Sequence, residues 1–255
     1  MPFLFSIITP VYNGIDGLEK TIASVLAQDP ALFEYTVMDG GSTDGTVAVL
    51  QAQGGRVRWV SEPDGGVYDA MNKGIDRATG EFVYFLGAGD TLRPDILGTV
   101  AALIPRDPMT YFYGNVFSEP YGRVYNGRYS KWKLSRINIP HQGVFCHRHL
   151  FDVVGRFDTR YAIMADHVWN MKCFGTANVR RVYADIVVAD YAAGGLSHHS
   201  PDPQLIADRL ALIGENLGLL PYALNKAAAL LPPGLKEARF QTFQKLRSRL
   251  PRLRK

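Results

Sequence analysis

Two short apolar runs in this 255-residue chain each end in a single aspartate, and this pattern most constrains the fold. Residues 35–38 lead into Asp39, and residues 82–86 lead through two glycines into Asp90. Short apolar runs rich in β-branched and aromatic residues are typical of buried strands in a parallel sheet. Ligands of open α/β sheets bind beyond the carboxyl ends of such strands. We therefore expect both carboxylates at a ligand-binding edge, unless each only caps a helix or starts a turn.

The first hundred residues alternate between strand-like and helix-like segments. Strands are predicted at 3–9, 35–38, 57–60 and 82–86, and helices around 18–25, up to residue 50, at 68–78 and from Pro94 as a first-turn proline. Such alternation predicts right-handed βαβ units, and hence an α/β fold with a mostly parallel sheet and helices on both faces.

Beyond residue 110 the pattern changes to mixed elements, which predicts a second binding surface. The expected elements are a hairpin at 110–117 and 123–125, short helices at 149–154 and 167–174, and strands at 179–182 and 186–191. Residues 200–203 supply a cap and a first-turn proline for a later helix. Its predicted buried stripe is Ile206, Leu210, Ile213 and Leu217.

Composition places the chain among ordinary globular proteins, with 47% hydrophobic and 20% charged residues. No apolar stretch reaches the roughly 18 residues of a membrane-spanning helix. The first residues lack the basic start and cleavage site of a signal peptide. The two cysteines, Cys146 and Cys173, show no metal-type spacing, so we expect a reducing, cytoplasmic location.

The net charge of +4 is unevenly distributed. Residues 236–255 hold eight basic residues and one acid, so this segment carries +7 and the rest of the chain −3. A mildly acidic body argues against a nucleic-acid partner. Phe240, Phe243, Leu246 and Leu250 share one face of a helix if the tail is helical, which is typical of a basic amphipathic segment at an anionic membrane surface. A packed helix with a solvated face and a disordered end are the alternatives.

Common nucleotide-binding motifs are missing from the sequence. There is no Gly-x-Gly-x-x-Gly after the first strand, no P-loop and no Gly-x-Ser-x-Gly elbow. Instead, the first strand runs into Pro10, Tyr12 and Asn13, where Tyr12 is suited to stack on a flat ring. If the two strands are neighbours, Asp39 emerges beside Tyr12. A carboxylate there can accept a hydrogen bond from a ring or amino N–H of a nucleobase.

Three ordered motifs, at 5–13, 39–45 and 78–90, resemble the family 2 glycosyltransferases. The resemblance covers about residues 3–195 and implies an inverting enzyme of the GT-A fold. Residues 66–74, together with 141–142, 165–166 and 194–197, resemble the subgroup that builds bacterial exopolysaccharides such as colanic acid and mycobacterial phenolic glycolipids.

The resemblance implies a role for each matched position. Donor contacts are expected from Thr9, Pro10, Tyr12, Asn13, Asp39, Asp64, Asp69, Lys73, Ala88 and Gly89. The alternative for Asp64 and Asp69, equally compatible with the sequence, is that they form a turn and place negative charge at the start of a helix. Asp90 is expected to bind Mg²⁺ or Mn²⁺ on the donor diphosphate, with His198 as a further ligand. Ala88 and Gly89 stand where many relatives carry acids, so weak metal affinity without donor is expected.

Acceptor chemistry is assigned to the second half of the domain. Asp166 matches the family's base position, His141 and Gln142 are expected to line the acceptor pocket, and burial would have to raise the pKa of Asp166 for base catalysis. The alternative is that Asp166 caps a helix starting at His167.

The sequence therefore predicts a GT-A domain at 1–198, with a nucleotide-sugar half at about 1–105 and an acceptor half at 106–198. A helical extension at 199–255 ends in a basic tail at 235–255. The expected activity is sugar transfer from a UDP- or GDP-type donor to a lipid-linked saccharide or glycolipid, at the cytoplasmic membrane face. An inactive nucleotide-binding scaffold and a nucleotidyltransferase are the rival hypotheses.

Overall fold

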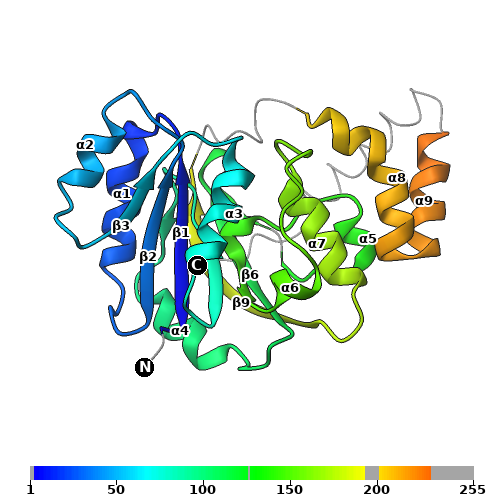
Figure 1. Ribbon diagram of the computed structural model, residues 1–255. Helices are drawn as coiled ribbons and strands as arrows, with labels where there is room; N and C mark the ends of the chain where they lie inside the picture. The colour runs from blue at the N-terminus through cyan, green and yellow to red at the C-terminus, as the bar shows by residue number, and fades with distance from the viewer. Residues whose placement is uncertain (1–2, 126, 193–200, 231–255) are drawn as a thin grey trace.

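The computed structural model describes residues 3–125, 127–192 and 201–230. Within these ranges a nine-stranded sheet forms the centre of the molecule, and helices cover both of its faces (Figure 1). The strand order is β3-β2-β1-β4-β8-β6-β9-β5, and β7 pairs with β6. The strands are β1 Phe5–Val11, β2 Phe33–Asp39, β3 Arg58–Ser61, β4 Phe82–Phe85, β5 Thr91–Leu92, β6 Thr110–Ser118, β7 Arg123–Tyr125, β8 Val144–His147 and β9 Arg180–Tyr191.

The α-helices and two short 3₁₀ turns connect these strands. They are α1 Ile15–Leu26, α2 Thr46–Gln51, α3 Val67–Arg77, α4 Ile96–Leu103, η1 Glu119–Tyr121, α5 Lys131–Leu134, η2 His141–Gly143, α6 Leu150–Val153, α7 Ala165–Gly175, α8 Pro203–Leu217 and α9 Leu219–Ala229.

The first half forms the parallel sheet that the sequence predicts. β1 pairs in parallel with β2 and β4, and β2 pairs in parallel with β3. Alternate residues of β4 face opposite sides: Phe82 and Tyr84 join the core cluster under α1, whereas Val83 and Phe85 join the cluster under α3 and α7. This two-residue period buries both faces of the strand, as expected in a doubly covered sheet.

The second half continues the same sheet with mixed pairing. β8 lies antiparallel between β4 and β6, and β9 runs parallel to β6. The sequence did not predict β8, because its apolar run spans only Val144 to Cys146. The strands predicted at 179–182 and 186–191 form one strand, whose pairing with β6 continues through two register shifts, one between Tyr183 and Val187 and one between Val187 and Ala189.

Two predictions about helices are wrong, one about where α4 begins and one about the buried face of α8. α4 begins at Ile96 after Asp95, which has a left-handed backbone, so Pro94 lies outside the helix. Ile206 is 65% exposed, and the neighbouring Leu205 is buried in its place. The cap and first-turn proline are confirmed, because the Asp202 side chain accepts a hydrogen bond from Leu205 N and Pro203 opens α8.

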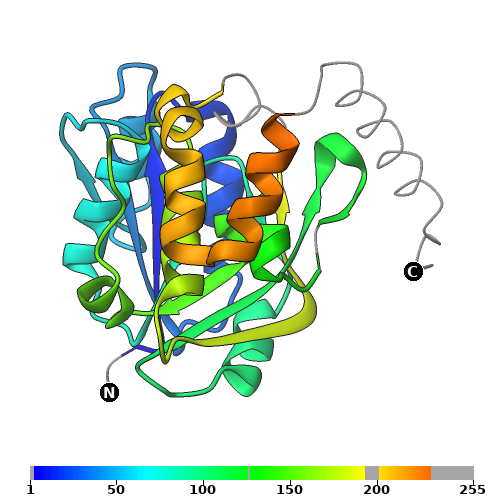
Figure 2. The same cartoon turned by 90° about the vertical axis from the view of Figure 1, so that its right-hand side faces the viewer.

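The two C-terminal helices differ in burial. α8 packs on α7 and contributes Leu212, Ile213 and Leu217 to the core beneath it. α9 lies beside α8 (Figure 2), and Pro221 is its one buried residue. The helix predicted within 235–255 lies outside the described residues. Within the described part of the chain, the helices are too short or too polar to cross a membrane.

Candidate active site

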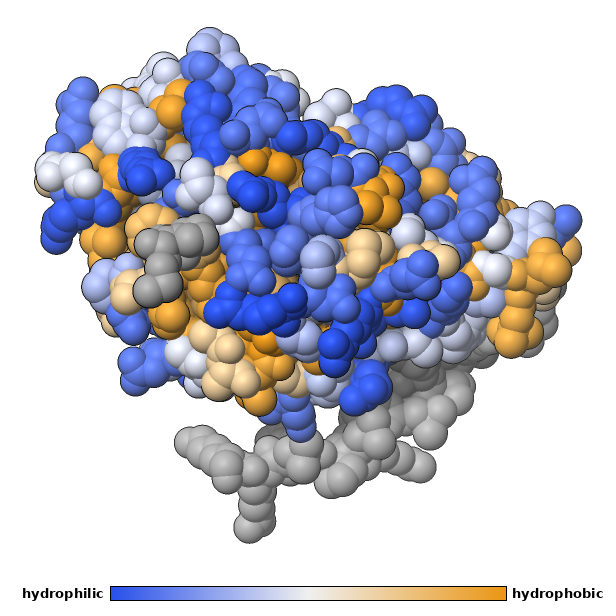
Figure 3. Space-filling view, turned by 60° about the horizontal axis from the view of Figure 1, so that its bottom comes forward, coloured by the Kyte–Doolittle hydropathy of each residue, from blue (hydrophilic) through white to orange (hydrophobic). Residues whose placement is uncertain are grey.

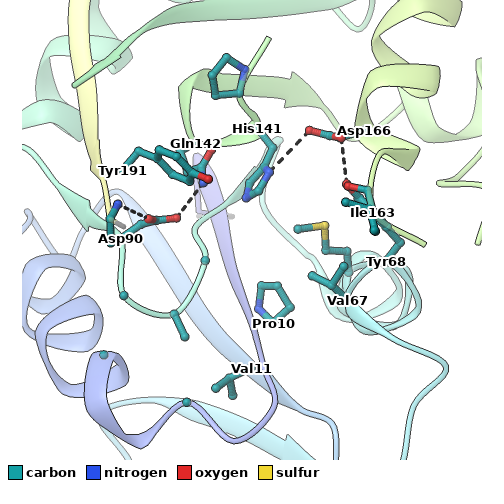
Figure 4. Close-up of a pocket in the computed structure, with 18 of the residues that line it drawn as sticks. Pro10, Val11, Val67, Tyr68, Asp90, His141, Gln142, Ile163, Asp166 and Tyr191 are labelled. Atoms are coloured by element: carbon teal, nitrogen blue, oxygen red, sulfur yellow. Dashed lines mark hydrogen bonds and ion pairs between the residues drawn. The ribbon is translucent and has the colours of Figure 1, made fainter. Parts of the chain in front are cut away.

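A cavity of about 1300 Å³ opens beyond the carboxyl ends of β1 and β4, where the sequence places its ligand-binding edge. Ten predicted site residues line it: Pro10, Tyr12, Asn13, Asp64, Ala88, Gly89, Asp90, His141, Gln142 and Asp166. Figure 4 shows Asp90 on one wall and Asp166 on another, with residues 141–142 between them. Tertiary folding thus brings both halves of the chain to one site.

The loop from 87 to 90 is shaped by its packing on α1. Gly89 has φ +101°, which favours glycine, and its backbone lies so close to Gly17 that a Cβ on Gly17 would come within 2.7 Å of Gly89 Cα. The Thr21 hydroxyl accepts from Gly89 N at 2.9 Å and donates to the Asp90 carbonyl at 2.8 Å. These contacts hold Asp90 at the end of β4.

Asp90 is 5% exposed and accepts two hydrogen bonds. Gln142 Nε2 donates to Oδ2 at 2.7 Å, and Ala192 N donates to Oδ1 at 2.9 Å (Figure 4). Burial raises the pKa of this carboxyl above its ordinary value, although both donors oppose the effect. Gln142 therefore contacts the predicted metal-binding carboxylate, whereas the sequence suggested an acceptor contact.

The residues around Asp90 fit a divalent cation that is shared with a ligand. Each Asp90 oxygen keeps one lone pair beyond its observed hydrogen bond, and in the described structure the two donors to this buried carboxylate are an amide side chain and a backbone amide. Among the described residues no group of three or more histidine, cysteine or acidic side chains is placed to hold a metal alone. Mg²⁺ and Mn²⁺ commonly take only one or two carboxylates beside substrate phosphates. His198 lies outside the described residues.

Asp166 is the second residue of α7 and is 6% exposed. Its Oδ1 accepts from the Tyr68 hydroxyl at 2.8 Å and from His167 N at 2.8 Å. Its Oδ2 accepts from Asn138 Nδ2 at 2.7 Å and faces His141 Nδ1 at 3.7 Å. The capping alternative is wrong, because α7 begins at Ala165 with Met164 as its N-cap residue, and Asp166 lies inside the helix. Its contacts place the carboxylate in the cavity wall.

The pKa of Asp166 is not raised, although the sequence-based interpretation takes a raised pKa as the condition for base catalysis by this carboxylate. Burial acts in that direction, but the imidazole of His141 and the hydrogen bonds from Tyr68 and Asn138 outweigh it, and the pKa lies below its ordinary value. Asp166 is therefore ionised throughout the neutral range. Asn138 is in turn held by Asn170, because Asn170 Nδ2 donates to Asn138 Oδ1 at 2.9 Å.

Asp39 is 2% exposed and does not line the cavity. It accepts from Gly41 N, from Ser42 N and Oγ, and from Ser61 Oγ at 2.6 Å. Ser42 Oγ also lies 2.7 Å from Asn13 N, so Asp39 fixes the loop that supports the Tyr12–Asn13 end of the cavity. This is the turn-forming alternative that the sequence left open.

Three further predicted donor contacts lie outside the cavity lining. Thr9 is fully buried, and its hydroxyl lies 3.0 Å from that of Tyr35. Asp69 accepts from Gly65 N at 2.9 Å, and Lys73 donates to Pro63 O at 3.1 Å. Asp69 and Lys73 therefore brace the 62–66 loop, which carries Asp64 into the cavity.

Sequence reasoning missed two partners of Asp166. Tyr68 stands in the motif at 66–74 and was not given a role, although its hydroxyl reaches the carboxylate. Asn138 carries no recognisable signal in the sequence, because its position depends on how the 135–140 segment crosses α7.

Comparison with known proteins identifies the family. The model of "Glycosyl transferase family 2" matches residues 6–169. A "PGL/p-HBAD biosynthesis glycosyltransferase" from Mycobacterium bovis is 36% identical over 211 residues, which cover 80% of this chain and 82% of that protein. An uncharacterized glycosyltransferase from Mycobacterium tuberculosis is 32% identical over 219 residues, with 82% of each chain covered.

Solved structures share the fold at lower identity. S. aureus TarS 1–349 in complex with UDP superposes with a TM-score of 0.64 at 20% identity, covering 82% of this chain and 64% of that chain. The Pyrobaculum calidifontis mannosyltransferase PcManGT, in complex with GDP-Man and Mn²⁺, gives a TM-score of 0.61 at 19% identity, with 96% and 80% covered. The fold is thus GT-A, and the chain belongs to glycosyltransferase family 2.

Proposed function

We propose that this glycosyltransferase moves a sugar from a nucleoside diphosphate donor to a hydroxyl group with inversion at the anomeric carbon. The observation that carries the proposal is the placement of Asp90 and Asp166 on different walls of one cavity, on either side of residues 141–142 (Figure 4). Inversion requires the hydroxyl to attack from the face opposite the leaving diphosphate. A carboxylate near each face meets this requirement, with Asp166 on the side of the deprotonated acceptor.

The donor nucleoside is assigned to the end of the cavity lined by Pro10 and Tyr12. Tyr12 is 65% exposed, so its ring is available to a base. Similar structures were solved in complex with UDP, UDP-GlcNAc and GDP-Man, which supports a nucleotide-sugar donor of either base type. Asp39 supports this end indirectly by holding residues 41–42.

Asp90 is the residue that would hold Mg²⁺ or Mn²⁺ together with the donor diphosphate. When bound, such an ion supplies Lewis-acid stabilisation of the departing diphosphate. Gln142 and the Ala192 amide orient Asp90 for this role through their hydrogen bonds. A further contribution from His198 remains a prediction.

A glycolipid or a lipid-linked saccharide is the acceptor class that we favour. The support comes from the Mycobacterium bovis relative, whose name assigns it to PGL/p-HBAD biosynthesis. It also comes from the sequence motifs shared with glycolipid and exopolysaccharide transferases.

Donor binding tests the proposal directly. A thermal-shift panel of UDP-glucose, UDP-GlcNAc, GDP-mannose and dTDP-rhamnose should identify at least one ligand that raises the unfolding temperature, with a larger shift when Mn²⁺ is added. NMR of the transferred sugar should then show the anomeric configuration opposite to that of the donor. Retention of configuration would refute inversion, and a panel without any shift would refute the donor assignment.

We also propose that the enzyme works at an anionic membrane surface, with α9 as part of the contact. Leu219, Leu220, Leu224 and Leu230 are 83%, 71%, 41% and 79% exposed. Figure 3 shows apolar side chains on the surface at the right-hand edge, where α9 lies. The sequence then continues into the basic 236–255 segment, and leucines beside lysines and arginines are the composition that binds anionic lipid interfaces.

Vesicle flotation separates the two parts of this contact. Deletion of 236–255 should release the protein from anionic vesicles while leaving donor hydrolysis intact, and L220E/L224E should weaken binding in the otherwise intact chain. L103E is the matched control, because Leu103 is a 48% exposed leucine at the end of α4. Equal binding of the wild type and both variants would refute membrane attachment through this end of the protein.

A further inference from the structure

Two tyrosines on the hairpin of β6 and β7 line the cavity and have no role in the sugar transfer proposed above. Tyr121 ends η1 and Tyr125 ends β7. Their ring centroids are 6.4 Å apart and their planes are inclined by only 14°, so the two ring faces have nearly the same orientation. Tyr121 is 56% exposed, and Tyr125 is half-buried. These two residues, the tyrosine pair, give one wall of the cavity an aromatic surface.

Hydrogen bonds at the base of the hairpin hold the tyrosine pair in place. The hairpin projects from the sheet at the right of Figure 2, and β7 pairs with β6. Beyond β7, Gly127 N donates to Asn115 Oδ1 at 2.8 Å, and Asn115 Nδ2 donates to Asp185 Oδ1 on β9 at 2.9 Å. The Arg123 guanidinium lies over the Tyr121 ring, 5.5 Å from its centroid. A surface braced in this way loses little conformational entropy when a ligand binds to it.

The tyrosine pair lies at the end of the cavity opposite to the one assigned to the nucleoside. Pro10 and Tyr12 lie at the end of β1, whereas the hairpin extends from the end of β6. β4 and β8 lie between these two strands in the sheet, which corresponds to a separation of about 14 Å. Asp90, the residue assigned to the diphosphate, follows β4. The hairpin is therefore placed beyond the diphosphate, on the acceptor side of the reaction.

The chain that follows the hairpin is bonded to the wall that carries Asp166. The Tyr129 hydroxyl donates to Asn138 O at 2.6 Å, and the Asn138 side chain donates to Asp166 Oδ2 at 2.7 Å. Asn138 and Arg136 also line the cavity. A molecule that rests on the tyrosine pair therefore occupies the part of the cavity that these residues share with Asp166.

The size and chemistry of the cavity favour a saccharide at this position. Its volume of about 1300 Å³ exceeds the roughly 300–1,000 Å³ of ordinary small-molecule sites, which leaves room for two reactants. The negative face of an aromatic ring attracts the weakly positive C–H groups on the apolar face of a pyranose. The tyrosine hydroxyls, Arg136 and Asn138 offer hydrogen bonds to sugar hydroxyls, which an acyl chain would leave unused.

We propose that the acceptor saccharide stacks the apolar face of a pyranose ring on Tyr121 and Tyr125, so that this hairpin selects the acceptor. The inference deepens the proposed function and rests on it. The stacked ring is held on the acceptor side of the diphosphate, in the part of the cavity that Asp166 borders. The tyrosine pair makes and breaks no bond. Its two residues determine specificity, and they act on the affinity for the acceptor.

Saturation-transfer NMR of the full chain tests the stacking with simple probes. The probes are the methyl glycosides of glucose, galactose, mannose and rhamnose, added with Mg²⁺ and the nucleoside diphosphate of the donor that gives the largest thermal shift. At least one glycoside should receive saturation from the wild type, mainly at the ring protons of one face. Its affinity should fall by roughly tenfold in Tyr121→Ala/Tyr125→Ala, and it should persist in Tyr121→Phe/Tyr125→Phe because the ring faces remain.

Two further variants control for folding and for general changes in the hairpin. Tyr121→Ala alone removes a mostly exposed ring, so it should keep the wild-type unfolding temperature and lose about threefold in glycoside affinity. Val124→Ala is the matched control, because Val124 is a 52% exposed residue of the same hairpin that does not line the cavity. It should bind the glycoside as the wild type does, and an equal loss in Val124→Ala would overturn the inference.

The failures are distinguishable. Unchanged glycoside affinity in the alanine variants, with a normal donor-induced thermal shift, overturns the inference and leaves the glycosyltransferase assignment standing. An equal loss in the phenylalanine variant assigns binding to the hydroxyls and overturns the stacking. A wild type that gives no signal with any glycoside, or that gives one only with phenol, overturns the choice of a saccharide. A wild type that binds none of the nucleotide sugars refutes the proposed function and the inference together.

Discussion

Replacing Asp166 by asparagine is the most informative single perturbation, because the contacts of Asp166 have a fixed direction. The Tyr111 hydroxyl donates to Asn170 Oδ1 at 2.7 Å, Asn170 Nδ2 donates to Asn138 Oδ1 at 2.9 Å, and Asn138 Nδ2 donates to Asp166 Oδ2 at 2.7 Å. Every donor in this series of hydrogen bonds points toward the carboxylate. The charge of Asp166 therefore sets the orientation of both amides.

Asparagine at 166 has only one oxygen to offer. If that oxygen stays with Tyr68 and His167 N, the new amide nitrogen faces Asn138 Nδ2, and two donors meet. The side-chain amide of Asn138 cannot flip without directing its nitrogen at Asn170 Nδ2, which is also a donor. Asn170 Nδ2 is held in place because it donates to Ile139 O at 3.1 Å as well. One buried hydrogen bond is thus lost with both donors unsatisfied, which costs about 1–3 kcal/mol.

The expected destabilisation of Asp166→Asn is about 2 kcal/mol, because relief of the buried charge offsets the lost charge assistance in the remaining bonds. For a chain of this size, that corresponds to a drop of roughly 4–8 °C in the unfolding temperature, measured by calorimetry. Asp152→Asn is the matched control, since Asp152 is a 77% exposed carboxylate on α6, and we expect it to leave the unfolding temperature unchanged.

The double variant Asn138→Asp/Asp166→Asn tests the reasoning further. Aspartate at 138 accepts hydrogen bonds from both Asn170 and the new amide at 166. Every donor in the series then has an acceptor again, and most of the lost stability should return. Sugar transfer should fall by about 10²–10⁴-fold in Asp166→Asn, with donor binding retained. Unchanged stability in the single variant would refute the directed-network argument, and unchanged turnover would remove Asp166 from the mechanism.

Three other predictions concern the donor half. Gly17→Ala should weaken donor-induced thermal shifts and cost about 1–3 kcal/mol in unfolding free energy, because its Cβ would press on the backbone of Gly89. Tyr12→Ala should weaken nucleotide-sugar binding in calorimetric titrations by roughly tenfold without a change in unfolding temperature, since the ring is 65% exposed. Glu34→Gln should cost about 1–2 kcal/mol at pH 7 in denaturant unfolding. That cost should shrink below about pH 4, because the pKa of Glu34 is lowered in the folded protein and its stabilisation is lost as the pH falls through the folded pKa.

The sequence predicts the first half of the fold well, because each strand there is an apolar run bounded by glycine or an acid and flanked by helical periodicity. β8 escapes prediction for a physical reason: its three apolar residues follow η2 directly, and its strand conformation depends on pairing with β4 and β6. The two predicted late strands form the single strand β9 because both pair with β6, and the sequence does not show this pairing.

The predicted site residues divide by the groups that their side chains contact. Asp90 directly precedes β5, and Asp166 is the second residue of α7; both side chains line the cavity. Asp39 is the last residue of β2, and Asp69 and Lys73 lie in α3, but each is close to a loop, and their side chains bond the backbone amides or carbonyls of that loop instead. Sequence spacing cannot show whether such a side chain turns to the cavity or to a neighbouring loop, because that depends on which backbone groups of the loop need a hydrogen-bond partner.

The adjacent pair at 141–142 explains how the two halves of the chain form one active site. Gln142 is bonded to Asp90 at the end of β4, and its carbonyl accepts from the buried Tyr84 hydroxyl at 2.8 Å. His141 faces Asp166 on α7, which belongs to the later, acceptor-side half. A 3₁₀ turn fixes the two side chains in different directions, so any shift of η2 moves the donor-side and acceptor-side contacts together. One short turn therefore sets the distance between the leaving diphosphate and the attacking hydroxyl. The geometry of η2 thus restricts catalysis more than the position of either carboxylate alone.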